Sequence, residues 1–165
     1  LASEQSAQEA NKIAGSKGAA SVKELFAKHA PETVRFFLLA THYRSPIQFS
    51  DELLDDSGRS LEAFYRFFKR YDRIVGTPFY GLSFPRTRKE GDAALPADGG
   101  NDFLKEVAAV RTKFLDAMDD DFNTGVGTAC LYDLLRVLNK YADNEKFEAT
   151  KPAADKLAAW QLGCA

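Results

Sequence analysis

This chain has little cysteine and almost no net charge, and each shortage excludes a class of protein. Its 165 residues include two cysteines, Cys130 and Cys164, which lie far apart and have no Cys-x-x-Cys or histidine partner at metal-ligand spacing. Neither a zinc site nor a disulfide framework is therefore predicted. The formal net charge of −2 gives no global attraction to nucleic acid, so any affinity for RNA must come from a local patch.

Long apolar segments are also lacking. No apolar run approaches the roughly 18 residues that a membrane span needs, and no charged-then-apolar leader is recognisable. We therefore expect a cytoplasmic protein without a membrane partner. The chain starts at Leu1 instead of a methionine, and we expect it to be a segment of a longer protein.

Apolar residues recur at helical spacing through most of the chain, whereas no stretch alternates in the manner of a strand. Residues 1–20 lack such a period and are expected to form a flexible arm. Six helices are predicted to follow, and their caps or first residues are Ser21, Pro31, Ser50, Asp102, Thr124 and Pro152. Residues 76–100, rich in Gly, Pro, Arg and Asp, are expected to form an insertion or long loop. The predicted fold class is all-α, a mostly antiparallel bundle of five or six helices over residues 21–162.

The helix predicted over residues 51–75 has two distinct faces. At 100° per residue, its apolar side chains fall within one sector of roughly 80°. These side chains are Leu61, Phe64, Phe68, Tyr71 and Val75. Four cations lie on the opposite side, namely Arg66, Lys69, Arg70 and Arg73. They could follow a phosphate backbone along about two helical turns, and the alternative is an ordinary solvated helix face.

No arrangement of residues predicts catalysis in this chain. The three aspartates at residues 119–121 are interpreted as electrostatic support for the next helix, with Phe122 filling the core, and not as a metal site. His42 has no Ser or Cys nucleophile at a recognisable turn, so catalysis by it is not expected. The glycines at residues 125–127 lack the third glycine and the preceding strand of a dinucleotide loop. No catalytic residue, metal site or cofactor site is therefore predicted.

Several motifs, taken in order, resemble the helical region that follows the catalytic domain of cysteinyl-tRNA synthetases. The two longest are Thr41-His42-Tyr43-Arg44-Ser45-Pro46 and Ala117-Met118-Asp119-Asp120-Asp121-Phe122-Asn123-Thr124. The likeness continues in Ile47-Gln48-Phe49-Ser50 and Leu131-Tyr132-Asp133-Leu134. A further string is similar to the segment that names the DALR anticodon-binding domain, with the arginine kept as Arg35, and it reads Glu32-Thr33-Val34-Arg35-Phe36-Phe37-Leu38-Leu39. The resemblance covers roughly residues 12–142 and gives structural roles to Arg35, His42, Arg44, Asp121 and Thr124.

The resemblance implies a domain that contacts and orients tRNA, expected to be tRNA-Cys, for ATP-dependent cysteinylation by the catalytic domain of the parent protein. The candidate contacts to the tRNA backbone are then Arg66, Lys69, Arg70 and Arg73. ATP and zinc are expected only in that catalytic domain, because its HIGH-type motif and zinc ligands do not occur in these residues. This segment alone is therefore not expected to be catalytic.

A short stretch near the start is similar in position to the KMSKS loop of the same family. Lys12 and Ser16 match the first and last letters of that motif, whereas Gly15 stands in place of its second lysine and Lys17 is shifted by two places. A missing cation removes stabilisation of the negative charge that develops during adenylate formation. Activation through this loop is therefore not expected unless Lys17 substitutes.

Two other functions remain open. One is a paralogue that ligates cysteine to a small amine, as the related mycothiol-pathway ligase does, and it would need no cations facing RNA. The other is a non-catalytic bundle that binds a protein partner through residues 79–84, whose apolar side chains are otherwise expected to dock onto the bundle. An upstream domain with a HIGH motif in the same reading frame would exclude this second alternative.

Overall fold

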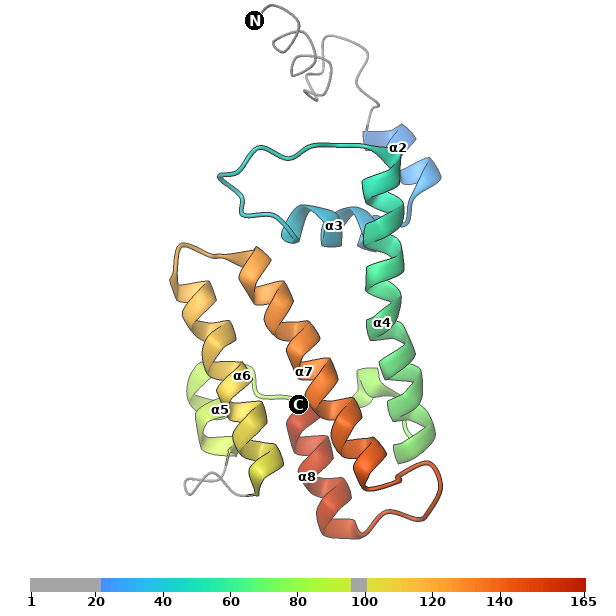
Figure 1. Cartoon of the computed structure of the whole chain (residues 1–165), viewed down its shortest axis with the longest axis vertical. Helices are drawn as coiled ribbons and strands as arrows, with labels where there is room; N and C mark the ends of the chain where they lie inside the picture. Colours follow the sequence, from blue (N-terminus) through green and yellow to red (C-terminus); the bar gives the residue numbers. More distant parts are fainter. Residues whose placement is uncertain (1–21, 96–100) are drawn as a thin grey trace, which may run out of the picture. The chain divides into compact units, whose positions relative to one another are not determined.

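The computed structural model describes residues 22–95 and 101–165, and every regular element in these ranges is helical. Seven α-helices and one short 3-10 helix follow one another, namely α2 Val22–Lys28, α3 Pro31–Leu39, α4 Asp51–Val75, η1 Phe79–Gly81, α5 Arg88–Ala94, α6 Asp102–Asp119, α7 Thr124–Asn144 and α8 Ala154–Cys164 (Figure 1). The all-α prediction is confirmed for these ranges. The predicted flexible arm and the Ser21 cap lie outside the described residues.

The described helices belong to two compact units, Leu1–Ala63 and Phe64–Ala165. Helix α4 contributes its first half to one unit and its second half to the other. The division between the two units falls in the middle of this helix. A physical reason is visible in the sequence, because residues 55–60 of α4 read Asp-Asp-Ser-Gly-Arg-Ser and supply no apolar side chain to join two cores.

The first unit has a small core formed by α3 and the start of α4. Val34, Phe37 and Leu54 are buried there, and the partly buried Leu25, Ile47 and Phe49 pack against them. Pro31 occupies the first turn of α3, as predicted, where its missing N–H costs no helical hydrogen bond. The predicted Ser50 cap is also confirmed, since its Oγ accepts the Leu53 N–H at 3.2 Å.

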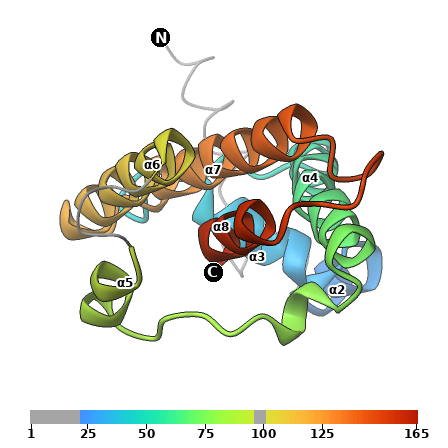
Figure 2. The ribbon, with the colours of Figure 1, turned by 90° about the horizontal axis from the view of Figure 1, so that it is seen from below.

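The second unit is built on α6 and α7, which run antiparallel, with α8 packed against both (Figures 1 and 2). Trp160 of α8 is fully buried, and its indole N–H donates to the Leu138 carbonyl of α7 at 3.0 Å. The rings of Phe67, Tyr71 and Phe147 surround Trp160, with centroids 5.9, 5.5 and 5.6 Å away. The second half of α4 is therefore joined to α7 and α8 through one aromatic core.

Several helix starts differ from the prediction. Asn101 caps α6 by accepting the Leu104 N–H, and Asn123 caps α7 by accepting the Val126 N–H, so the predicted caps Asp102 and Thr124 are instead the first helical residues. The last helix begins at Ala154, two residues after the predicted Pro152. At the starts of α6 and α7, two adjacent residues can each cap the helix, and backbone geometry determines which one does. The N-cap of α8 is Ala153, which makes no side-chain cap hydrogen bond.

The described part of the predicted insertion or long loop, residues 76–95, contains two short helices. These are η1 and then α5, which begins after Thr87 and is capped by the Thr87 Oγ1. Arg111 of α6 holds α5 in place, since its guanidinium donates to Asp92 Oδ1 at 2.6 Å and to the Arg88 carbonyl at 3.0 Å. This segment is therefore a packed part of the second unit as far as residue 95.

Candidate nucleic-acid interface

The four predicted cations on the second half of α4 do not share one environment. Arg66, Lys69 and Arg73 are exposed, whereas the Arg70 side chain is only 14% exposed. The expectation that all four face solvent is therefore wrong for Arg70. The cations that the structure leaves accessible are Arg66, Lys69 and Arg73, which we call the α4 cations.

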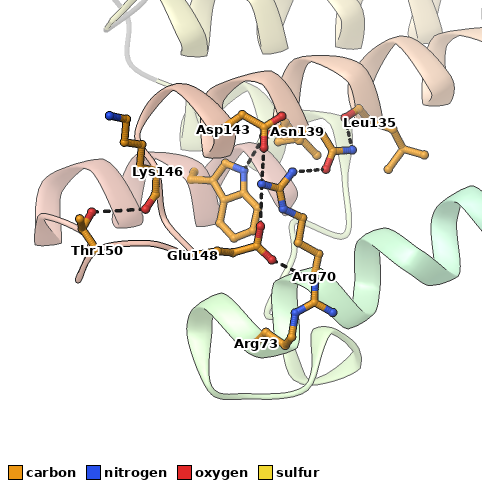
Figure 3. Close-up of polar contacts among 10 residues, drawn as sticks. Arg70, Arg73, Leu135, Asn139, Asp143, Lys146, Glu148 and Thr150 are labelled. Atoms are coloured by element: carbon orange, nitrogen blue, oxygen red, sulfur yellow. Dashed lines mark hydrogen bonds and ion pairs between the residues drawn. The ribbon is translucent and has the colours of Figure 1, made fainter.

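Arg70 is held by α7 and the segment that follows it (Figure 3). Its Nη1 donates to Asn139 Oδ1 at 2.7 Å, and its Nη2 forms ion pairs with Asp143 at 2.5 Å and with Glu148 at 3.0 Å. The Asn139 amide is itself oriented, because its Nδ2 donates to the Leu135 carbonyl at 2.9 Å. A phosphate could not reach both terminal nitrogens of Arg70 without displacing these partners.

The position of Arg70 on the helix explains why it turns inward. It follows Phe67 by three residues and precedes Ile74 by four, so it lies at the margin of the apolar face. Phe67 is one of the most deeply buried residues of the unit, although the predicted apolar sector did not include it. The carboxylates that receive Arg70 are more than 70 residues away in sequence, so the helical period alone could not predict the pairing.

Arg73 and Lys69 differ in their local charges. Arg73 is 63% exposed and its Nη2 pairs with Glu148 Oε1 at 2.9 Å. The hydrogen bond from Arg73, together with the nearby charge of Arg70, holds the pKa of the Glu148 carboxyl below its ordinary value. Lys69 forms no ion pair with any residue in the described ranges. Its ammonium group is thus the most available of these charges.

Other cations of the second unit are mostly neutralised. Arg88 pairs with Asp119 at 2.8 Å, and the Asp119 carboxylate raises the pKa of the Arg88 guanidinium. Lys140 lies 3.5 Å from Glu106, and Arg136 pairs with Asp133 at 2.9 Å. The aspartates at residues 119–121 therefore supply at least one structural ion pair. Phe122, expected in the core, is instead 66% exposed, because Asp121 and Phe122 both take a left-handed backbone with φ of 53° and 54°.

The motif residues of the first unit form local contacts at its surface. Arg35 donates to Glu32 Oε1 at 2.9 Å within α3, and both side chains are exposed. In the turn after α3, His42 Nδ1 accepts the Arg44 N–H at 3.2 Å, and the His42 ring stacks on Tyr43. Arg44 Nε donates to the Tyr43 hydroxyl at 2.9 Å. The contacts of His42, Tyr43 and Arg44 are all made within this turn.

A cavity of about 780 Å³ lies in the second unit among α5, α6, α7 and the end of α8. Its wall is mostly apolar and includes Phe114, Cys130 and Leu134, with Arg86 and Arg111 among its polar residues. Burial raises the pKa of the Cys164 thiol at the end of α8, so that thiol is a weak nucleophile at neutral pH. Cys164 is not among the residues that line the cavity.

Two further observations concern metals and membranes. Across residues 22–95 and 101–165, no three His, Cys, Asp or Glu side chains are grouped closely enough to hold a metal ion. In the same ranges, no helix combines the length and apolar character needed to cross a bilayer. The KMSKS-like residues Lys12, Ser16 and Lys17 lie outside the described part of the chain.

Comparison with known proteins gives a consistent result. The DALR domain family matches residues 113–162, which include the end of α6, all of α7 and most of α8. A cysteine–tRNA ligase from Geobacter sp. (strain M21) is 37% identical over 143 residues, which cover 84% of this chain and 27% of the relative. The cysteine–tRNA ligase of Pelobacter propionicus is 35% identical over 121 residues, covering 73% of this chain and 23% of the relative. The cysteine–tRNA ligase of Chromohalobacter salexigens is 38% identical over 121 residues, which cover 73% of this chain and 20% of the relative. This chain thus spans only about a fifth to a quarter of the length of these curated relatives.

Proposed function

Since this chain belongs to the DALR-domain part of the cysteine–tRNA ligase family, we propose that it binds tRNA and orients it for cysteinylation, with the α4 cations in contact with the RNA backbone. The observation that carries this proposal is the exposure of Arg66, Lys69 and Arg73 on one helix. At a rise of about 1.5 Å per residue they span about 10 Å, enough to meet two or three consecutive phosphates. The expected RNA is tRNA-Cys.

Arg70 has a different part in this proposal. Its contacts to Asn139, Asp143 and Glu148 hold α4 against α7, so Arg70 positions the α4 cations and does not itself bind phosphate. Glu148 also lies against Arg73, and the guanidinium of Arg73 keeps further donors for a phosphate oxygen. A phosphate at Arg73 must therefore share this side chain with a carboxylate, whereas Lys69 has no such competitor in the described ranges.

The chemistry of ligation belongs, in this proposal, to a catalytic domain outside these 165 residues. ATP and zinc would be bound there, and the domain would be the second partner of the helices described above. A cytoplasmic location fits this role, because the curated relatives are cysteine–tRNA ligases. The contribution of this chain is to bind and orient the RNA.

A salt titration tests the proposal. Three phosphate contacts predict that log K for tRNA-Cys falls with log[salt] with a slope of about −2 to −3, a loss of about 15- to 40-fold between about 50 and 200 mM salt. Replacement of Arg66, Lys69 and Arg73 by alanine should weaken binding at low salt and remove most of this slope. Circular dichroism and the melting temperature would show that the variant remains folded.

A matched control removes three other exposed cations of the second unit, Lys105, Lys113 and Arg136, and so changes the net charge by the same amount. This variant should keep most of the affinity and the slope. Equal losses in both variants would mean that total charge, and not α4, governs binding. Unchanged affinity in the α4 variant would contradict the proposal and favour the small-amine ligase instead.

A further inference from the structure

Next to the α4 cations, the second unit exposes a cluster of aromatic rings. Tyr65 and Phe68 come from α4 and Tyr80 comes from η1, and we call these three side chains the aromatic platform. Tyr80 is 79% exposed and Tyr65 is 38% exposed, while Phe68 is partly covered. The Phe68 ring lies 5.6 Å from Tyr80 and 6.2 Å from Tyr65, centroid to centroid. An exposed group of contacting rings marks a surface that a partner can cover.

Phe79 of η1 fixes the position of the aromatic platform. Phe79 stacks on Phe68 with centroids 4.2 Å apart and an interplanar angle of 16°, and it also meets the edge of Tyr71 at 5.3 Å. The Phe79 N–H donates to Asp72 Oδ1 at 2.6 Å, which fixes η1 to α4. Tyr80 therefore projects from an ordered turn, and a ligand that covers it has little backbone to immobilise.

The charges around the platform are mostly positive. Lys69 follows Phe68 directly and lies one helical turn after Tyr65, and Arg66 and Arg73 are exposed on the same half of α4. The acidic neighbours on α4 are Glu62, three residues before Tyr65, and Asp72, whose Oδ1 accepts the Phe79 N–H. Flat rings beside cations are the surface chemistry that recognises a nucleobase with its flanking phosphates.

We propose that the aromatic platform stacks an unpaired base of the bound RNA, while the α4 cations hold the phosphates on either side. The inference rests on the proposed tRNA binding and adds a base contact to it. Bases within a helical stem are already stacked on their neighbours, so only a loop or a single-stranded end can present a free face. The platform thus selects unpaired nucleotides, with little preference for one base, because every base has a π-face.

Two labelled probes separate stacking from charge. One is an oligoadenylate of about ten nucleotides and the other is an abasic oligomer of the same length and charge. Replacing Tyr80 by alanine should weaken binding of the oligoadenylate about five- to tenfold and leave binding of the abasic oligomer unchanged. Tyr80→Trp should retain the affinity for oligoadenylate, because indole also offers a flat π-face. Phe84→Ala is the matched control, since Phe84 is an exposed ring of the same unit outside the platform.

The outcomes distinguish the two proposals. Replacing the α4 cations should weaken binding of both oligomers, whereas replacing Tyr80 should weaken binding of the oligoadenylate only. Equal affinity of the wild type and Tyr80→Ala for oligoadenylate would overturn the platform while leaving the backbone contact intact. An equal loss on both oligomers would also overturn it, since stacking needs a base. If the α4 variant instead keeps its affinity for both oligomers, the backbone contact fails and a Tyr80 effect still supports stacking.

Discussion

Substitution of Arg70 by alanine should destabilise the second unit without removing a direct contact to RNA. The change deletes the guanidinium that joins Asn139, Asp143 and Glu148 to α4 (Figure 3). It also removes the stem of the side chain, which is covered along most of its length because only 14% of the Arg70 side chain is exposed. The mutation therefore tests whether the buried member of the four cations is a positioning residue.

The expected magnitude follows from the exposure of the partners. A hydrogen bond to a charged group contributes about 1.5–3 kcal/mol, and breaking a fully buried pair costs about 3–5 kcal/mol. Asp143 and Glu148 are 65% and 42% exposed, so water can solvate them when Arg70 is absent. The lower range applies, and we expect a loss of about 2 kcal/mol in the free energy of unfolding. For a chain of this size, that loss corresponds to a decrease in Tm of about 4–8 °C.

Thermal denaturation monitored by circular dichroism measures the change, and tRNA binding is followed at two salt concentrations. Lys69→Ala is the control on the same helix, and its Tm should shift by no more than the equivalent of about 0.5 kcal/mol because Lys69 has no ion pair in the described ranges. The two variants should therefore show opposite patterns. Arg70→Ala lowers Tm and keeps the salt slope of binding, whereas Lys69→Ala keeps Tm and reduces the slope by about one phosphate contact.

The reverse pattern for Arg70 would refute this reasoning. If Arg70→Ala melts at the temperature of the wild type and lowers the salt slope, the network with α7 is not stabilising and Arg70 reaches the RNA. The interface would then include all four cations that the helical period predicts.

Three further predictions concern packing, capping and pH. Gly163→Ala should lower the free energy of unfolding in denaturant by about 1–3 kcal/mol, because an added Cβ would lie 2.7 Å from Phe103 Cζ. In the control Gly81→Ala, the added Cβ meets no described atom within 4 Å, so the free energy of unfolding should change by no more than about 0.5 kcal/mol. Asn123→Ala should lower the free energy of unfolding by about 1 kcal/mol, because it removes the acceptor of the Val126 N–H. An equal or larger loss of stability in Thr124→Ala would contradict the assignment of Asn123 as the cap. The lowered pKa of Glu148 predicts a stabilisation that is complete above the ordinary pKa of 4.5 and is lost as the pH falls through the lowered value. The difference in Tm between the wild type and Glu148→Gln should thus shrink from about pH 6 to about pH 3, and a constant difference would show that the Glu148 charge is not involved.

The parts of the fold that the sequence predicted well depend on local signals. Helix α4 has a long apolar period and a Ser50 cap followed by acidic residues, and its observed bounds match the predicted residues 51–75. Pro31 likewise marks the start of α3. These signals act within one or two helical turns, where propensity, capping and the helix dipole all favour the same boundary.

Helix α5 shows a local signal that was present but was outweighed by composition. Thr87 and Glu90 have the spacing of a capping box, and the Glu90 N–H donates to Thr87 Oγ1 at 3.2 Å. The Glu90 carboxylate in turn accepts the Arg86 N–H at 2.8 Å. Because glycine and proline are frequent around this segment, its composition favours an insertion or long loop. The spacing of Thr87 and Glu90 is the local signal that indicates the start of this helix.

The error at Phe122 has another origin. An aromatic residue between two helices favours a core position, although the adjacent Asp121 is a residue type that tolerates a left-handed backbone. Asp121 and Phe122 both take positive φ, which non-glycine residues adopt seldom, and this geometry turns the ring toward solvent. The conformation occurs in the short connection between α6 and α7, where the chain reverses direction between two antiparallel helices.

The candidate interface depends on the same distinction between local and distant contacts. The helical period places four cations on one side of α4. The carboxylates of Asp143, near the end of α7, and Glu148, just beyond it, bind Arg70, and the other three cations stay exposed. By binding Arg70, those residues reduce the positive charge of the surface and at the same time fix α4 against α7. A fixed surface loses less conformational entropy when RNA binds, so fewer accessible cations can still give useful affinity. Acidic partners of Arg70 are therefore compatible with an RNA-binding role for α4, because they supply the rigidity on which its exposed cations and rings depend.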